Sequence, residues 1–359
     1  MSPPFDLLVI GDANPDVVLG PVPRTLAFGQ REQLVEHASL VLGGSAAIMA
    51  CGAARLGLRV AFAGRVGDDP AGAFVRRSLT DRGVDVTALA TDPVLPTPLT
   101  TVVLADGGDR AILTAPGTLA STGPADVPAA LLAEVRHVHA ASFFLLPRLA
   151  ARLHEVFALA HTHGASTSLD TNDDPDQRWD AALLGPVLGV TDVLLPNAAE
   201  ARALAAALAE GPAGGAAGGS GGDTTGDAAG DAAGDAAQEL SEVAAALSAR
   251  GPLTVVKDGA DGALAHDGTR TLRAAPPAVE AVDTVGAGDS FDAGYVAAVL
   301  RGLDPSSALE FAAACGALST RAHGGTAAQP TWDEASSAAS ATVATAAATA
   351  TASNRRISR

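Results

Sequence analysis

The sequence has little positive charge and few aromatic residues. Among 359 residues, 23 are Lys or Arg and 40 are Asp or Glu, which gives a net charge of −17. This argues against nonspecific binding to nucleic acid or anionic membranes, because both depend on basic patches. Lys257 is the only lysine, so a site that clamps phosphate with several lysines is excluded. Aromatic residues make up 3%, so the core must be built from Ala, Val and Leu.

Long apolar runs and paired cysteines are also missing. No uninterrupted apolar run approaches the roughly 18 residues of a membrane-spanning helix. The start, MSPPFDLLVIGD, lacks the basic segment and long apolar core of a secretion signal. Cys51 and Cys315 lie far apart in Ala-rich stretches, as buried thiols in a reducing compartment do. We therefore expect a cytoplasmic protein with neither membrane nor nucleic acid as partner.

Apolar runs and glycine stops alternate along the chain in the order of an α/β fold. Residues 5–12 (FDLLVIGD) predict a buried strand, and residues 43–57 predict a turn followed by a helix. Strands predicted at 135–143, 165–172, 192–197 and 253–259 alternate with helices. This pattern predicts a doubly wound, mainly parallel central sheet flanked by helices. Residues 97–114 instead predict an antiparallel hairpin with an Asp-Gly-Gly turn.

Two segments fall outside this alternation. Residues 211–237 contain GDAAGDAAGDAA and almost no large apolar side chain, so we expect a disordered surface insertion. Residues 336–359, rich in Ala, Thr and Ser, form a low-complexity tail. The tail fits a weak helix or a flexible end, and we favour disorder. We assign no function to either segment.

Residues 283–291 (DTVGAGDSF) place two glycines and two aspartates before a helix-like segment. Gly286, Ala287 and Gly288 permit close approach by a ligand, toward which the first N–H groups of a helix point. A phosphate group suits that position. Asp289 then has two interpretations: a first-turn acid of the helix, or a base beside an anion hole.

Residues 43–72 begin with Gly43 and Gly44 and continue through RLG to GRVGDDPAG. Together with DTVGAGDSF, they resemble the ribokinase-like (PfkB) family of carbohydrate and nucleoside kinases, in the family's order and spacing. The resemblance covers residues 5–333 apart from the insertion. It implies a ribokinase-like kinase domain over residues 1–335, with a small β-sheet lid formed by about residues 14–42 and 95–115.

The resemblance implies roles for the residues that match the family motifs. Asp170 and Asn172 would lie at a strand end near the transferred phosphate. The implied substrate-binding residues are Asn14, Asp16, Gly43, Gly44, Ser45 and Asp289. The implied nucleotide-binding residues are Asn197, Lys257, Gly259, Gly262 and Gly288.

Several of these residues also have an ordinary structural interpretation. Asp16 fits a turn acid after a strand, and the LDTNDDP segment fits a loop. Asn197 and Glu200 fit a capping box, which does not exclude a role of Glu200 toward a metal. Lys257 fits a strand residue with a solvated tip, and we give it no catalytic role.

The implied reaction is phosphoryl transfer from ATP to an alcohol. Asp289 would take the proton of the attacking hydroxyl group late in a loose transition state. The N–H groups of Ala287, Gly288 and Asp289 would stabilise the transferring group. Mg²⁺ would neutralise the β- and γ-phosphates near Glu200, directly or through water. The lid would close over the substrate and exclude water.

Two further features are implied by the resemblance alone. The first is a homodimer through the lid edges. The second is a monovalent cation such as K⁺ behind the anion hole. The cation ligands that it implies are Asp283 and the Val285 carbonyl group, with backbone around Ser319, Ala322 and Gly324.

The chain departs from the family pattern at three positions. Ile48 stands where Asn usually reaches a substrate hydroxyl group, which puts one substrate hydrogen bond in doubt. Ala313 stands where some members carry Asn near the nucleotide, so adenine recognition must rest on shape and backbone. Ser45 stands where kinases of phosphorylated sugars often carry a basic residue. Phe143 and Phe144 fit ligand-lining residues and core residues equally well.

The predicted function is ATP-dependent phosphorylation of a hydroxyl group of a small, unphosphorylated sugar. A nucleoside kinase of the same fold is the nearest alternative, but Trp179, Trp332 and the only tyrosine are badly placed to stack on a base. A non-catalytic regulator that binds sugar or nucleotide is another, and the intact GAGD argues against it. GDANPD lacks the Gly-x-Gly-x-x-Gly of a Rossmann-type dehydrogenase.

Overall fold

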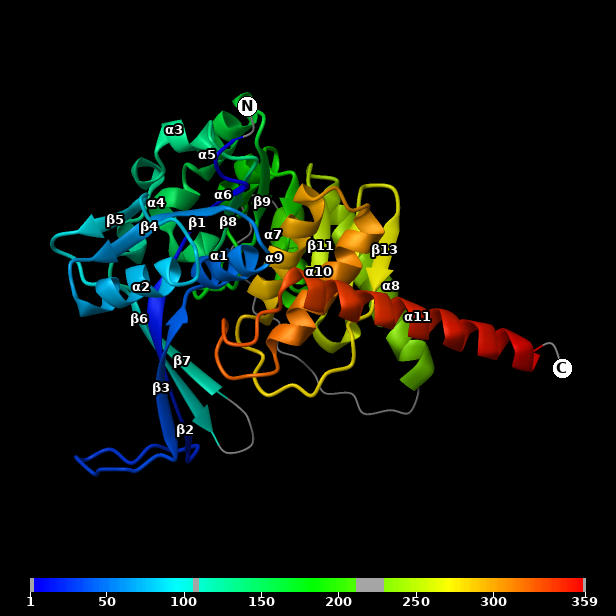
Figure 1. The fold of residues 1–359 in the computed structure, drawn as a ribbon, viewed down its shortest axis with the longest axis horizontal. Helices are drawn as coiled ribbons and strands as arrows, with labels where there is room; N and C mark the ends of the chain where they lie inside the picture. Colours follow the sequence, from blue (N-terminus) through cyan, green and yellow to red (C-terminus); the bar gives the residue numbers. More distant parts are fainter. Residues whose placement is uncertain (1–2, 106–109, 211–228, 358–359) are drawn as a thin grey trace.

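A mainly parallel sheet forms the centre of the molecule (Figure 1). The structure, a computed structural model, describes residues 3–105, 110–210 and 229–357. Within these ranges the sheet has nine strands in the order β13-β12-β11-β10-β9-β8-β1-β4-β5. The strands from β11 to β5 are parallel, whereas β12 and β13 return antiparallel. Their bounds are β1 (Leu7–Ile10), β4 (Val60–Gly67), β5 (Leu89–Asp92), β8 (His137–Ala140), β9 (Ser166–Leu169), β10 (Val193–Leu194), β11 (Leu253–Lys257), β12 (Ala263–His266) and β13 (Thr271–Ala274).

Helices cover both faces of the sheet, because successive side chains of a strand point to opposite faces. In β1, Leu7 and Val9 belong to one buried cluster, and Leu8 and Ile10 belong to the other. The predicted doubly wound sheet is thus confirmed. The first cluster includes α1 (Ser45–Arg55), α2 (Pro70–Thr80), α9 (Ala287–Leu300) and α10 (Pro305–Ser319). The second includes α3 (Ala129–Leu132), α4 (Pro147–Ala150), α5 (Leu153–Thr162), α6 (Ala181–Leu188), α7 (Ala198–Glu210) and α8 (Ala229–Ser248).

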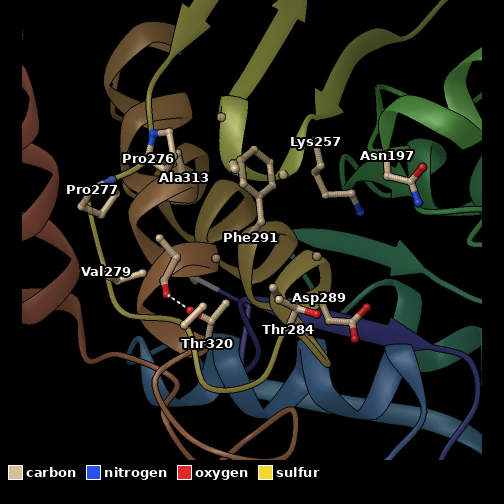
Figure 2. Close-up of a pocket in the computed structure, with 18 of the residues that line it drawn as sticks. Asn197, Lys257, Pro276, Pro277, Val279, Thr284, Asp289, Phe291, Ala313 and Thr320 are labelled. Carbon is tan, nitrogen blue, oxygen red and sulfur yellow. Dashed lines mark hydrogen bonds between the residues drawn. The ribbon is translucent and has the colours of Figure 1, made fainter. Parts of the chain in front are cut away.

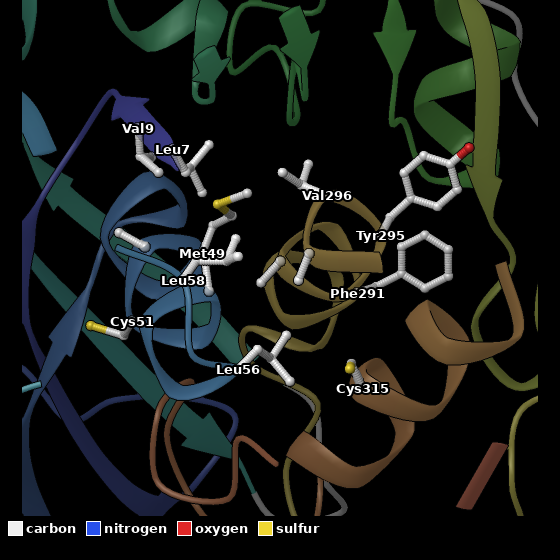
Figure 3. Close-up of a cluster of buried hydrophobic side chains, with 14 of the residues drawn as sticks. Leu7, Val9, Met49, Cys51, Leu56, Leu58, Phe291, Tyr295, Val296 and Cys315 are labelled. Carbon is white, nitrogen blue, oxygen red and sulfur yellow. The ribbon is translucent and has the colours of Figure 1, made fainter. Parts of the chain in front are cut away.

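Side chains of β1, α1, α9 and α10 gather in the first cluster (Figure 3). A Cβ atom on Gly294 of α9 would lie 2.8 Å from the Sγ of Cys315 on α10. Close approach of this kind packs a core that is rich in Ala and poor in aromatic rings. Cys315 and Cys51 are both buried free thiols, as predicted.

A second, smaller sheet projects from the edge of the main body (Figure 1). It consists of β2 (Asn14–Val22), β3 (His37–Gly43), β6 (Leu99–Ala105) and β7 (Arg110–Ala115), in the order β3-β2-β6-β7. The β6–β7 pair is antiparallel, as the hairpin prediction requires, and β2 pairs with β6 in parallel. The predicted Asp-Gly-Gly turn lies outside the described residues. The small sheet uses the segments expected for the lid.

The two low-complexity segments differ from the expectation of disorder. Residues 229–237 belong to helix α8, and residues 211–228 lie outside the described residues. The tail continues α11 (Trp332–Ile357), which Figure 1 shows extending away from the body. Both segments are rich in alanine, the residue with the highest helix propensity, which accounts for the difference. None of the described helices is long and apolar enough to cross a membrane.

Candidate active site

A pocket of about 800 Å³ lies at the carboxyl ends of the central strands (Figure 2). Asp170 follows β9, Asn197 follows β10 and Lys257 ends β11, and all three line it. Helices α9 and α10 contribute the opposite wall. A doubly wound sheet binds its ligands at this edge, and the volume suits a small molecule. The pocket is therefore the candidate active site.

The first turn of α9 faces this pocket. Gly286, which precedes the helix, has φ of 72°, and a Cβ atom there would lie 2.6 Å from the Cα of Gly325. Only glycine fits such a turn. No described side chain caps the helix, and Gly288 and Asp289 both line the pocket. The turn therefore presents backbone N–H groups and the positive end of the helix dipole, a combination that binds anions.

Asp289 is buried, with 8% of its surface exposed. Burial raises its pKa well above the usual value, and the negative charges of Asp170 and Asp12 raise it further. The positive charge of Lys257 and the polar Ser45 side chain oppose that rise. A carboxylate with a raised pKa is a better proton acceptor than an ordinary exposed aspartate.

Asn14 and Asp16 form a buried pair where β2 begins. The Nδ2 of Asn14 donates to the Oδ1 of Asp16 at 2.6 Å. Burial, reinforced by the nearby Asp12 carboxylate, raises the pKa of Asp16 to about 7. The Asp16 carboxyl group lies directly over Gly43, where a Cβ atom would come within 2.1 Å of it. Gly43 is therefore required because a side chain there would collide with Asp16. Gly44 adopts φ of 90°, a conformation that favours glycine.

Asn197 and Glu200 form the capping box that the sequence allowed. The backbone N–H of Asn197 donates to the Oε2 of Glu200 at 2.8 Å, and the backbone N–H of Glu200 donates to the Oδ1 of Asn197 at 3.0 Å. Both side chains also line the pocket. Burial and the charge of Asp170 raise the pKa of Glu200 to about 7. Capping and a role toward a ligand are therefore compatible at Glu200.

The expectation that the tip of Lys257 is solvated was wrong. Its Nζ donates to Asp170 at 2.7 Å and to both carboxylate oxygens of Asp292 at 3.1 Å, and its side chain is 10% exposed. Burial lowers the pKa of Lys257, but Asp170 and Asp292 outweigh that effect and raise it. The sequence analysis missed Asp292, whose signal was its position one helical turn after Asp289.

Asn172 connects the end of β9 to α1. Its Oδ1 accepts the backbone N–H of Ser142 at 2.6 Å, and its Nδ2 donates to the Oγ of Ser45 at 3.2 Å. Phe143 and Phe144 follow Ser142 in a short 3₁₀ turn (Phe143–Leu145) and pack edge to face. Neither ring lines the pocket, and Phe143 is 2% exposed, so the core interpretation holds for it.

Asp283 links the loop before α9 to the loop after α10. Its Oδ1 accepts the backbone N–H of Val285, and its Oδ2 accepts that of Gly324, each at 3.0 Å. Ser319 is buried at the end of α10, just before the loop that contains Gly324. The structure thus brings Asp283, Val285 and Gly324 together, while it gives no contact that places Ala322 beside them.

The far end of the pocket is apolar. Pro276, Pro277 and Val279 form one wall, as Figure 2 shows, and Ala313 of α10 lies on another. Gly259 and Gly262 also line the pocket, with φ of 56° and 94°. This end suits a flat, weakly polar group, whereas the end with Asn197 and Lys257 suits phosphate.

Ile48 does not line the pocket. Its side chain is 4% exposed and lies against Gly286 and Gly325, which would meet it at 2.9 Å and 2.6 Å if they carried a Cβ atom. The Nε2 of Gln329 donates to the Ile48 carbonyl oxygen at 2.9 Å. Ile48 therefore supports the back of the anion-binding turn.

Comparison with known proteins places these features in context. A family model described as pfkB family carbohydrate kinase matches residues 5–332. The solved structure of Arabidopsis thaliana ribokinase with ribose and ATP has a TM-score of 0.73 at 22% identity, covering 94% of this chain and 99% of that chain. The ribokinase-like fold is thus confirmed over nearly the whole length.

Curated relatives carry kinase names. The chain is 31% identical over 291 residues to ATP-dependent ribose-1-phosphate kinase of Halopiger xanaduensis, covering 81% of this chain and 84% of that protein. It is 29% identical over 304 residues to a fructokinase of Escherichia coli, covering 80% and 88%. It is 28% identical over 340 residues to aminoimidazole riboside kinase of Salmonella typhimurium, covering 91% and 92%.

Proposed function

The chain belongs to the pfkB family of carbohydrate kinases, and we propose that it transfers the γ-phosphoryl group of ATP to a hydroxyl group of a small, unphosphorylated sugar. One observation carries this proposal: Asp289, a buried carboxylate, lies in the first turn of α9 beside the N–H groups that line the pocket. A base and an anion-binding turn side by side are what transfer of a phosphoryl group to an alcohol requires.

Asp289 and the turn that carries it act on the reacting atoms. The sugar hydroxyl oxygen attacks the γ-phosphorus, the bond to the bridging β-phosphate oxygen breaks, and ADP leaves. The Asp289 carboxylate takes the hydroxyl proton as the new O–P bond forms, which its raised pKa favours. The N–H groups of Gly288 and Asp289 donate to the transferring group, whose negative charge the helix dipole stabilises. The N–H of Ala287, which donates to the Thr284 carbonyl oxygen at 3.3 Å, would join them.

The sugar lies between the small sheet and the start of α1. Asp16, paired with Asn14, accepts hydrogen bonds from sugar hydroxyl groups, and Gly43 and Gly44 let the sugar approach the backbone. Ser45 offers a hydroxyl group and no positive charge. A sugar that already carries a phosphate group therefore finds no cation from this residue, which favours an unphosphorylated acceptor.

ATP fits the pocket with its phosphates toward Asn197 and Gly288 and its base between the apolar walls near Ala313. Glu200 and Asn197 offer carboxylate and amide oxygens, the ligand type that Mg²⁺ prefers. Within the capping box only the Oε2 of Glu200 accepts a backbone N–H, so its Oε1 suits the ion or a water bound to it. Bound Mg²⁺ supplies positive charge to the β- and γ-phosphates.

Two expectations about ions and assembly belong to the same proposal. Asp283, whose carboxylate bridges the two loops behind the anion-binding turn, would hold K⁺. Two copies pair through the small sheet, where Leu40, Ile112 and Leu113 are 53%, 59% and 61% exposed. Activity with and without K⁺, and the mass of the particle in solution, test these two points separately.

A nucleoside is the second candidate acceptor. It is favoured by the likeness to aminoimidazole riboside kinase, which extends over 91% of this chain. The sugar part of a nucleoside would use the same Asn14 and Asp16. The nucleobase would then occupy the space above the sugar, and the chemistry at Asp289 would be unchanged.

An acceptor panel with ATP and Mg²⁺ tests the proposal. We expect ADP to form when ribose, fructose or another unphosphorylated sugar is added, and not with ATP alone. Turnover with nucleosides only, or with ribose 1-phosphate only, would move the assignment to that acceptor class. No acceptor-dependent turnover with any of these compounds, from protein that binds ATP, would contradict the kinase proposal.

A further inference from the structure

The chain's only lysine is buried against two acids of the site. Lys257 donates to Asp170 at 2.7 Å and to Asp292 at 3.1 Å, and the exposed fractions of the three side chains are 10%, 2% and 1%. The three residues come from β11, the end of β9 and α9, so folding alone brings them together. Apart from Lys257, the residues counted as Lys or Arg are all arginine. A compact ammonium group fits beside Gly288, where a Cβ atom would lie 3.5 Å from the Nζ.

Asp289 is enclosed by acids on several sides. Carboxylate oxygens of Asp170, Asp289 and Asp292 lie within 4.8 Å of one another. Asp12, from the segment after β1, and Ser45 of α1 also act on Asp289, in opposite directions. Lys257 is the positive charge that acts on Asp289 within this group. Without that charge, buried carboxylates this close to one another retain protons.

We propose that Lys257 is a positioning residue of the phosphoryl transfer: its ammonium group, held between Asp170 and Asp292, favours the ionised form of the Asp289 carboxylate inside this buried acidic group. The inference rests on the proposed role of Asp289 as base. A protonated Asp289 cannot accept the proton of the sugar hydroxyl group, so loss of the ammonium group would restrict the active base to higher pH. Lys257 acts through Asp289 and need not touch the sugar.

The direction of the charge effects supports this reading. Burial and Asp170 raise the pKa of Asp289, and Lys257 lowers it. Removal of Lys257 should therefore raise the pKa of Asp289, and removal of Asp170 should lower it. Removal of Lys257 and removal of Asp170, which lie in contact in the fold, are thus expected to shift the titration of Asp289 in opposite directions.

Carbon-13 NMR of aspartate-labelled protein measures the titration without turnover. The carboxyl resonance of Asp289 is the one that disappears in Asp289→Asn. In Lys257→Met we expect its midpoint to rise by about one pH unit or more, a tenfold change in the ionised fraction at a given pH. In Asp170→Asn we expect the midpoint to fall. The double variant should return toward the wild-type value.

Kinetics on the same variants provide the second readout. In Lys257→Met, the pH at which kcat falls on the acid side of the profile should rise by the same amount as the NMR midpoint. Turnover should recover at high pH. Where Lys257→Met fails to fold, the comparison of Asp170→Asn with the double variant measures the same removal of the ammonium group.

A purely structural role makes a different prediction. Lys257→Met would then lower the free energy of unfolding but leave the Asp289 midpoint and the acid limb unchanged, and that result would overturn the inference. If the wild-type protein phosphorylates no acceptor, the proposed function fails, while the NMR midpoint still decides whether Lys257 controls the ionisation of Asp289.

Discussion

Replacing Asp16 by asparagine should stabilise the fold at alkaline pH. Asp16 is 8% exposed, and burial together with the Asp12 carboxylate raises its pKa to about 7. An ionised carboxylate at this position is therefore unfavourable in the folded protein. In Asp16→Asn the amide oxygen can still accept the hydrogen bond that Asn14 donates at 2.6 Å. The substitution removes the charge with little change of shape.

The magnitude follows from the pKa difference between the two states. In the unfolded chain Asp16 titrates near 3.8, and in the folded protein near 7. Its contribution to stability is fully present below pH 4 and is lost as pH rises toward 7, because the unfolded state releases the proton first. Between pH 5 and pH 8 the loss is about 2.5 kcal/mol, at about 1.36 kcal/mol per pKa unit.

Urea unfolding at pH 5 and pH 8 measures this loss. Relative to the wild type, Asp16→Asn should gain about 2.5 kcal/mol more unfolding free energy at pH 8 than at pH 5. Asp69→Asn serves as the pH-independent control. Burial disfavours the ionised form of Asp69, but hydrogen bonds from Thr97 and Gly72 outweigh this and lower its pKa. Because Asp69 is ionised in both the folded and the unfolded state above about pH 5, Asp69→Asn should lower the free energy of unfolding equally at pH 5 and pH 8. Equal effects of Asp16→Asn at both pH values would refute the reasoning.

Three other predictions follow from the site geometry. Gly43→Ala should displace the carboxyl group of Asp16, since the new Cβ would lie within 2.2 Å of its atoms. The KM for the sugar should then rise about tenfold or more, with ATP affinity unchanged in a calorimetric titration. Ile48→Ala should cost about 2–4 kcal/mol of unfolding free energy in urea, because the side chain is buried against Gly286 and Gly325. The value of kcat/KM should fall as pH drops through the raised pKa of Asp289, and a flat profile down to pH 4 would exclude Asp289 as the base.

Sequence patterns predicted much of the fold because those patterns are local. The run LLVI of β1 and the glycines at 43, 44 and 286 each determine a neighbouring strand, turn or helix start, and the structure places them so. The hairpin of β6 and β7 and the Asn197–Glu200 capping box were likewise readable from short spacings. Alanine-rich repeats misled the assignment of 229–237, because low hydrophobicity argued for disorder while helix propensity favoured α8.

The charge network of Lys257, Asp170 and Asp292 could not be predicted from a local sequence pattern. Lys257 lies 87 residues from Asp170 and 35 from Asp292 in the chain. Its burial follows from how β11, the end of β9 and α9 converge, which no local pattern specifies. Asp12 was overlooked for the same reason, since its effect on Asp16 and Asp289 depends on the junction of β1 with α1. The contact of Ile48 with the anion-binding turn likewise depends on how α1 packs against that turn, and a local pattern does not specify this packing.

The central claim is that Asp289 is the base of a sugar kinase. Sugar-dependent formation of ADP by the wild type and by Asp289→Asn, at pH 8 with saturating ATP and Mg²⁺, tests it most directly. We expect turnover to fall by about 10² to 10⁴ in the variant while ATP binding and the urea midpoint show an intact fold. Turnover of Asp289→Asn within a few-fold of the wild type would contradict the account.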